Sequence, residues 1–241
     1  MDVRKNSDKL YELPASLLLE EGKSKFNQHS FYTDNSMAYL RKYNGFTQQY
    51  KAGIQGERAT MKYIPLTQPD DFNASNLSLY FNPYFQLQRG KWLATLSLPL
   101  KAQRYFSQQR SFLFFNPSTY LRYKLDYHWT FSLYGSLKRS AGDFSDLYPG
   151  LYQTDYRTWR SGNGLFPTST TQTYNLYGEY KNTVQEFFVT ASLTYSRSNR
   201  NTLFEQSVSE NAIVYTRREL PNHSDSWNLS STLSKGIYDW H

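Results

Sequence analysis

Apolar and polar residues alternate with a period of two along most of the chain. Between residues 46 and 55, apolar side chains such as Phe46, Tyr50 and Ile54 share one parity, while Gln49 and Lys51 share the other. Because successive side chains of a β-strand point to opposite faces, each such stretch has one apolar face and one polar face. Repeated stretches of roughly ten residues with this pattern are typical of strands in a membrane β-barrel.

The alternation predicts about ten strands, with the weakest pattern in the first and in the ninth. Pro83, Pro99 and Pro117 fall inside these stretches, and we interpret them as rim or bulge positions because proline cannot donate to a strand ladder. The predicted strands are residues 29–41, 46–57, 77–88, 92–103, 112–125, 129–138, 171–181, 187–196, 213–219 and 227–236.

Short turns alternate with long polar connections between these strands. Asn44-Gly45 is a strong hairpin signal, since both residues tolerate positive φ. Further short turns are expected near residues 90, 127, 183 and 238, and longer connections at 58–75, 104–111, 140–169 and 198–212. Outer-membrane barrels have short turns at one rim and long loops at the other, whereas sandwich connections do not alternate so regularly.

The predicted fold is therefore all-β, an antiparallel up-and-down transmembrane β-barrel. We expect an irregular N-terminal segment at 1–28 and a partial barrel domain at 29–241. An open sheet edge in lipid leaves backbone groups unsatisfied, so ten strands must either close a small barrel or belong to a larger one.

Composition agrees with this fold. Aromatic residues make up 18% of the chain, as the aromatic girdles of a membrane barrel require. Mean hydropathy is −0.73 and no apolar run reaches about 18 residues, which excludes a transmembrane helix.

The net charge of +7 does not indicate nucleic-acid binding, because the cations are scattered rather than clustered. Most fall on the polar parity of their strands, where they would face the inside of a barrel. The charged residues predicted to face the lumen are Lys51, Arg122, Lys124, Glu179 and Lys181, and Lys138 has the same parity.

Catalytic and metal-binding patterns are missing from the sequence. The four histidines are far apart, there is no cysteine, and no nucleophile elbow, P-loop or dinucleotide fingerprint occurs. We expect neither an enzyme, nor a cofactor, nor a metal site.

The connection at 140–169 is long enough to suggest a functional loop. Its aromatic residues could stack on sugars or cofactors, and its arginines could grip carboxylates or phosphates. The alternative is that the aromatics pack the loop onto itself or into the barrel mouth. The candidate ligand-binding residues are Tyr148, Tyr152, Tyr156, Arg157, Trp159, Arg160 and Phe166.

A series of short motifs from residue 155 onward is similar to a family pattern. The motifs are Asp155-Tyr156-Arg157, Gly162-Asn163-Gly164-Leu165, Pro167, Thr173-Tyr174-Asn175-Leu176 and Glu179-Tyr180-Lys181. Their order resembles the barrel of TonB-dependent outer-membrane receptors of Bacteroides-type bacteria, over roughly residues 30–241.

That resemblance implies a 22-stranded barrel in the bacterial outer membrane, closed by an N-terminal plug domain and driven by TonB. It also implies nutrient uptake, of a glycan, a peptide or a metal chelate, with a surface lipoprotein as a further partner and outer-membrane lipid around the barrel. Since no plug, TonB box or export signal is recognisable here, we expect the chain to be an internal piece of the barrel.

Two alternatives stay open at this stage. The first is a small passive pore or adhesin of ten strands, complete in itself. The second is a soluble glycan-binding β-sandwich, which would bury the apolar rows between two facing sheets.

Overall fold

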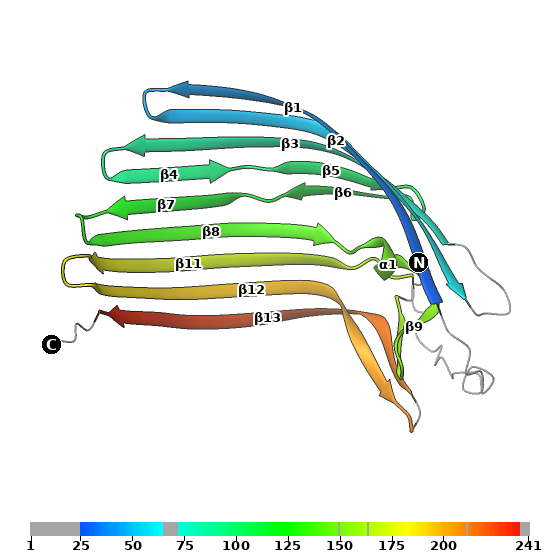
Figure 1. Cartoon of the computed structure of the whole chain (residues 1–241). Coiled ribbons are helices and arrows are strands. Elements are labelled where there is room, and N and C mark those ends of the chain that lie inside the picture. Colours follow the sequence, from blue (N-terminus) through cyan, green and yellow to red (C-terminus); the bar gives the residue numbers. More distant parts are fainter. Residues whose placement is uncertain (1–24, 65–71, 149, 163, 211, 237–241) are drawn as a thin grey trace.

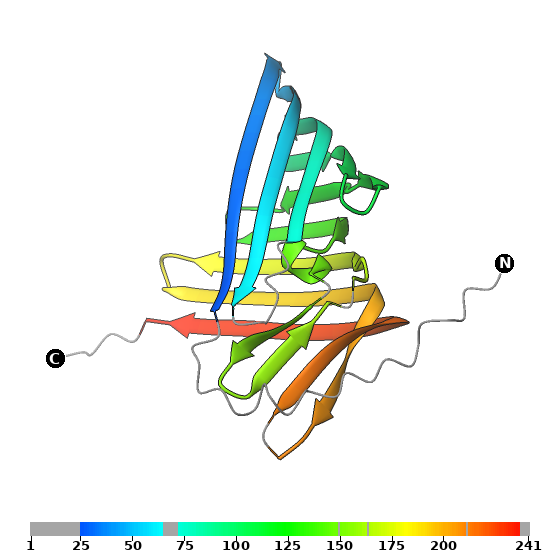
Figure 2. The same cartoon turned by 90° about the vertical axis from the view of Figure 1, so that its right-hand side faces the viewer.

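A computed structural model of the chain describes residues 25–64, 72–148, 150–162, 164–210 and 212–236. These residues form one strongly curved sheet, in which β1 to β3 rise steeply against β11 to β13 (Figures 1 and 2). The strands are β1 (Lys25–Tyr43), β2 (Phe46–Ile64), β3 (Phe72–Arg89), β4 (Trp92–Ser97), β5 (Leu100–Tyr105), β6 (Arg110–Phe115), β7 (Ser118–Lys124), β8 (Trp129–Ala141), β9 (Leu151–Asp155), β10 (Thr158–Ser161), β11 (Thr168–Asn182), β12 (Phe187–Val208) and β13 (Ile213–Lys235), with one short helix, α1 (Phe144–Leu147).

The long strands follow one another in an up-and-down order. The sheet runs β1-β2-β3-β4-β7-β8-β11-β12-β13, with β5 and β6 continuing β4 and β7. Each neighbouring pair on this path is antiparallel. The short turns lie as predicted between β1 and β2, β3 and β4, β7 and β8, and β11 and β12, all at one end of the sheet (Figure 1). This confirms the all-β, antiparallel up-and-down fold.

The first turn shows why its sequence signal is strong. Asn44 and Gly45 both have positive φ, at 43° and 82°. The N–H of Gln88 donates to the carbonyl of Gly45 at 2.7 Å, and the carbonyl oxygen of Gln88 lies where a Cβ at residue 45 would be, so any other residue would collide with it. Only glycine meets both conditions, since it has no Cβ.

The predicted strand ends need correction, mainly at the long-loop end. β1 begins at Lys25 rather than residue 29, while residues 1–24 lie outside the described part. β12 runs to Val208 through the stretch expected to be a loop, and the predicted strands 213–219 and 227–236 are one strand, β13. The sequences of these strand ends are mostly polar and therefore predict loops. A strand that extends beyond the apolar band of a barrel needs no apolar face. Leaving out the hairpin β9–β10, and counting β4–β5 and β6–β7 as single interrupted strands, nine long strands are described.

The three strand prolines lie side by side in mid-sheet, not at the rim. Pro99 and Pro117 interrupt β4–β5 and β6–β7, and Pro83 lies within β3 beside them. Their carbonyls still accept hydrogen bonds of 2.9–3.0 Å from Leu98, Asn116 and Leu137. Ser97 pairs with Ser118 and Leu100 with Phe115, so the register is unchanged across the gap and no bulge forms.

One face of the sheet is apolar and exposed, as a surface surrounded by lipid requires. On this face, Leu193 lies between its pairing partners Leu176 and Leu229, all exposed. Aromatic pairs mark two levels: Trp129–Tyr180 at 4.9 Å near the short turns, and Tyr195–Trp227 at 4.6 Å further out. From Phe187 to Tyr195 a strand rises about 26 Å before tilt, comparable with the roughly 25 Å apolar band of outer-membrane barrels.

Packing is concentrated on the opposite face at the long-loop end. There the wall residues Ala59, Met61, Ala74 and Tyr105 are buried against the segment 142–167. That segment, predicted to be irregular, contains α1 and the hairpin β9–β10. β10 pairs with β13 in parallel, which extends the sheet beyond β13 at this end (Figure 2).

Candidate functional site

All five charged residues predicted to face the lumen lie on the polar face of the sheet. Lys124 and Glu179 both pair with Thr130, so the three form one row across β7, β8 and β11. Direct partners in an antiparallel ladder point to the same face, so these pairings fix the direction of each side chain. The other three pairings are Lys51 with Asn82, Arg122 with Ser132, and Lys181 with Phe188.

A polar network on β1–β3 was not anticipated from the sequence. The Tyr80 hydroxyl donates to Asp34 Oδ1 at 2.8 Å, and Gln55 Nε2 donates to Asp34 Oδ2 at 3.4 Å. Tyr80 can cross β2 only because Gly53 lies beneath its ring, where a Cβ would overlap the hydroxyl. The Lys51 ammonium lies 5.6 Å from the Tyr80 ring centroid. The pairing of Gly53 with Tyr80 was the only sequence signal for this network, and it can be recognised only when the register of β2 and β3 is known.

Cations dominate the polar face. Besides the five residues above, the pairing of Lys101 with Tyr80 and of Lys138 with Thr171 places two more lysines there, the second with the parity predicted for it. Glu57 is one of the few acids, and it accepts from Asn76 Nδ2 at 3.2 Å. A wall with this charge favours anionic surfaces or solutes.

The segment 142–167 buries four of its predicted binding residues. Tyr148, Tyr152, Trp159 and Phe166 are each less than 10% exposed and belong to the packed cluster. The rings of Tyr105 and Phe166 lie 4.6 Å apart, which joins the segment to β5. These positions match the packing alternative, and a ligand could contact the four side chains only by displacing their neighbours.

The end of the segment is anchored by Asn201. The ladder between β12 and β13 shifts register between Arg200 and Thr202, which frees Asn201 from strand pairing. Its Oδ1 accepts from the N–H of Thr168 at 2.6 Å, and its Nδ2 donates to the carbonyl of Phe166 at 2.9 Å. The bulge therefore fixes the point where the segment returns to the wall.

Two predicted binding residues stay accessible at the tip of the hairpin. Tyr156 is 85% exposed and Arg157 is exposed beside it. The Asp155 carboxylate accepts from the N–H of Tyr156 at 2.7 Å, and Gln153 Nε2 donates to the carbonyl of Tyr156 at 2.8 Å. The tip is thus held in one backbone conformation while both side chains point into solvent.

Beneath the hairpin, two arginines share one carboxylate. Asp146 Oδ1 lies 2.5 Å from Arg217 Nη2 and 3.5 Å from Arg160 Nη2. Both guanidinium groups lie over the Phe204 ring, at 4.3 Å for Arg160 and 4.6 Å for Arg217. Burial raises the pKa of the nearby Tyr152 hydroxyl, which therefore stays protonated. Sequence reasoning named Arg160 but missed Asp146, Phe204 and Arg217.

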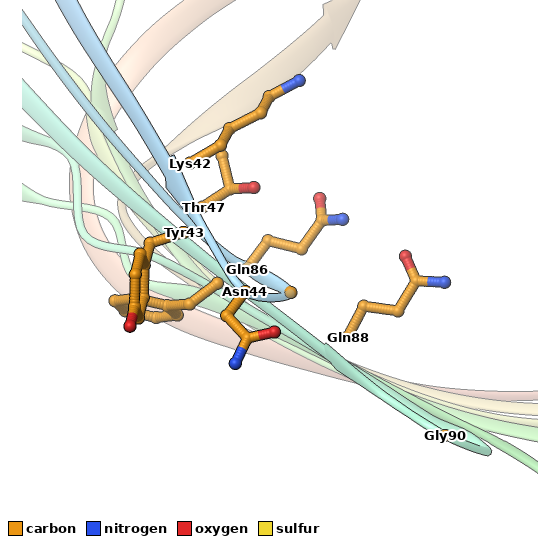
Figure 3. Close-up of a pocket in the computed structure, with 9 residues that line it drawn as sticks. Lys42, Tyr43, Asn44, Thr47, Gln86, Gln88 and Gly90 are labelled. Carbon is orange, nitrogen blue, oxygen red and sulfur yellow. The ribbon is translucent and has the colours of Figure 1, made fainter.

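An open hollow of about 470 Å³ lies at the short-turn end. Figure 3 shows Lys42, Thr47, Gln86 and Gln88 on one side of the ribbons and Tyr43 on the other. The hollow thus offers an ammonium, a hydroxyl and two amides, all from the polar face, and could contact a polar surface that fills the barrel.

In the described part of the chain, no group of three or more histidine, aspartate and glutamate side chains is placed to hold a metal ion. Among the same residues, no helix is long and apolar enough to cross a membrane.

The structure is similar to parts of several larger bacterial receptors and transporters. A ferric enterobactin receptor (PfeA mutant) from Pseudomonas aeruginosa matches 87% of this chain with a TM-score of 0.55 and 17% identity, over 33% of its own length. The copper transporter OprC matches 86% with a TM-score of 0.61 and 9% identity, over 36% of its length. The FrpB iron transporter from Neisseria meningitidis matches 87% with a TM-score of 0.55 and 11% identity, over 34% of its length.

These similarities establish the fold and the extent of the match. The chain has the architecture of a barrel wall and spans about a third of each of these three proteins. No family model matches the chain, and no curated protein sequence matches it either.

Proposed function

We propose that the chain forms part of the wall of a TonB-dependent receptor barrel in the bacterial outer membrane. Its role there is to separate lipid from the transport path and to carry an external segment, 142–167, into the mouth of the barrel. The observation that carries the proposal is the division of nine long strands into an exposed apolar face and a polar, cationic face.

The two free edges of the sheet support a larger barrel. Among the described residues, β1 pairs only with β2, and β13 beyond Thr216 pairs only with β12. In lipid, such edges must find partner strands, since unpaired backbone groups cost several kcal/mol each. Further strands of the parent chain would pair there and complete the 22 strands that the resemblance implies.

The polar face suggests the partners. A plug domain would occupy the inside of the barrel, against the row containing Lys124 and Glu179 and the rim hollow near Lys42. TonB would act through the plug, and a surface lipoprotein would deliver the solute to the mouth. Among glycans, peptides and metal chelates, the excess of cations favours an anionic solute, such as an acidic glycan or a chelate carrying carboxylates.

A passive pore is the second candidate, favoured by one observation. The hairpin continues the sheet past β13, and β9 lies close to β1, so the two ends of the sheet approach each other at the long-loop end. A purified chain that forms discrete conductance steps in a planar bilayer would support this candidate. The β-sandwich requires two facing sheets, whereas the described strands form one.

The proposal is tested first by the coding sequence around this chain. It requires an upstream export signal and plug, together with roughly thirteen more strands, the difference between the proposed 22 and the nine described here. A coding sequence that ends without them would contradict the receptor assignment.

The external segment is tested at the hairpin tip. Tyr156→Ala with Arg157→Ala should reduce uptake or solute binding by the full receptor and leave its assembly intact, because both side chains are exposed. Tyr127→Ala is the matched control, since Tyr127 is also accessible but lies in a short turn at the opposite end. Normal uptake by the tip variant would remove the tip from the solute path.

A further inference from the structure

The most unusual buried group in the described chain is the guanidinium of Arg217. Its side chain is 5% exposed, and only Nη2 has a partner, the shared Asp146 Oδ1. Buried Nε and Nη1 have no hydrogen-bond acceptor among the described residues. Buried donors of a charged group are normally all satisfied, because leaving them unpaired costs the full desolvation of the group.

The charge around Arg217 is also unbalanced. Arg160 approaches the same carboxylate oxygen, so two cations share one anion. The Phe204 ring lies against the faces of both guanidinium groups and attracts these cations weakly. It cannot accept hydrogen bonds from the N–H groups, which point outward in the guanidinium planes. The cluster formed by Asp146, Arg160, Phe204 and Arg217 therefore carries one excess positive charge.

We propose that this cluster is an oxyanion-binding site whose ligand competes with Asp146. Each fork of the Arg217 guanidinium, Nε with Nη2 or Nη1 with Nη2, could hold a carboxylate or phosphate through two parallel hydrogen bonds, and each fork includes the Nη2 that Asp146 now occupies. Arg160, 38% exposed along its side chain, supplies a second cation from the solvent side. The ligand class is a soluble molecule that carries a phosphate or carboxylate group.

Binding at this site is coupled to the position of the segment 142–167. Asp146 lies on α1 and Arg160 on β10, both in the segment, whereas Arg217 and Phe204 belong to the wall strands β13 and β12. Because Nε and Nη1 are buried and Asp146 occupies Nη2, an anion reaches a fork of Arg217 only when Asp146 moves away with α1. The anion thus stabilises a released segment, and Asp146 acts as the internal anion that holds it closed. This goes beyond the proposed function, since it concerns the segment whether or not the barrel imports a solute.

The closed position can be measured by a disulfide between the hairpin and the wall. Thr158 and Ile213 pair directly between β10 and β13, and adjacent strands lie within disulfide reach. The sequence has no cysteine, so Thr158→Cys with Ile213→Cys gives one defined crosslink in the intact protein in detergent micelles. Thr190→Cys with Thr232→Cys, a pair within the wall, reports folding and general oxidation.

The probe is inorganic phosphate, with sodium chloride at equal ionic strength as the control. Phosphate should slow the hairpin crosslink by about fivefold or more, the lower end of common coupling strengths, and leave the wall crosslink unchanged. Asp146→Asn should shift this response to lower phosphate concentration, because the competing carboxylate is gone. Arg217→Gln should abolish the response, whereas Arg218→Gln, the exposed neighbour paired with Glu205, should keep it.

Three results would overturn the proposal. One is a hairpin crosslink insensitive to phosphate in both the parent and the Asp146→Asn background while the wall pair forms normally. Another is a response that persists in Arg217→Gln or that chloride reproduces. The third is a response to phosphatidylglycerol in the micelle but not to phosphate, which would assign the site to a lipid headgroup instead of a solute.

Discussion

The two ends of the same strands follow different rules. Near the short turns, the polar face stays polar and accessible, as Lys124 and Lys181 show. Near the long loops the same face becomes apolar and packed, with Met61 and Ala59 completely buried. Strand parity is identical at both ends, so the pleat determines where a side chain points but not what covers it.

The difference comes from the segment 142–167. It supplies Leu147, Trp159 and Phe166, whose apolar surface would otherwise face water at the mouth of the barrel. Burying them against the wall makes a small globular core within a protein whose other apolar rows stay exposed. The long-loop end is therefore stabilised by the hydrophobic effect within the protein, and the short-turn end by strand pairing, with lipid covering its apolar face in the proposed barrel.

The largest expected effect is on the packed core. Trp159→Ala removes a buried indole and should destabilise the segment by about 3–5 kcal/mol. Trypsin should then cleave after Arg157 and Arg160 much faster, while the heat-modifiable gel mobility of the assembled barrel stays normal. Loss of assembly would mean that the core and the wall form one cooperative unit.

A charge placed on the lipid face comes next. Leu193→Arg introduces a cation in the middle of the apolar band and should cost about 2–4 kcal/mol of folding free energy in lipid. Ser192→Arg is the matched control, because the adjacent residue points to the polar face beside Tyr177. Equal effects of the two variants, measured by urea unfolding in vesicles, would contradict the assignment of the faces.

The first short turn gives a smaller effect. Gly45→Ala combines a positive φ with a collision at the Gln88 carbonyl, and should cost more than about 1 kcal/mol. Gly90→Ala shares the positive φ but has open space around its Cβ, so its penalty should be lower. The same unfolding measurement compares the two, and a larger penalty at residue 90 would reject the role of the Gln88 contact.

The smallest effect is a dependence on pH at the turn between β7 and β8. Backbone N–H groups of Trp129, at 2.7 Å, and of His128, at 2.8 Å, hold the pKa of Asp126 below its usual range. Because the folded-state pKa is depressed, the ionised carboxylate stabilises the turn above the unfolded pKa of about 3.9. This stabilisation is lost as the pH falls through the folded-state pKa. The protection factor of the Trp129 amide, its exchange rate corrected for the intrinsic rate at each pH, should therefore fall in acid in the parent protein. Asp126→Asn should remove that acid dependence.

Much of the wall could be predicted from the sequence. The alternation around Leu193, the Asn44-Gly45 turn and the charged residues of the polar face depend only on the period of a strand and on local turn chemistry. The predicted strand ends were wrong where the strands leave the apolar band, because polar strands such as residues 198–208 carry no alternation to detect.

The sequence by itself determined the strand parity, the order of turns and the separation of an apolar face from a polar one. These follow from backbone geometry, which acts between residues close in the chain. Only the tertiary structure decided that Tyr152 and Trp159 are buried and that Asp146 meets Arg217, 71 residues away. Such contacts depend on how a long segment folds back on the sheet, and a pattern of neighbouring residues does not indicate which distant residues will meet.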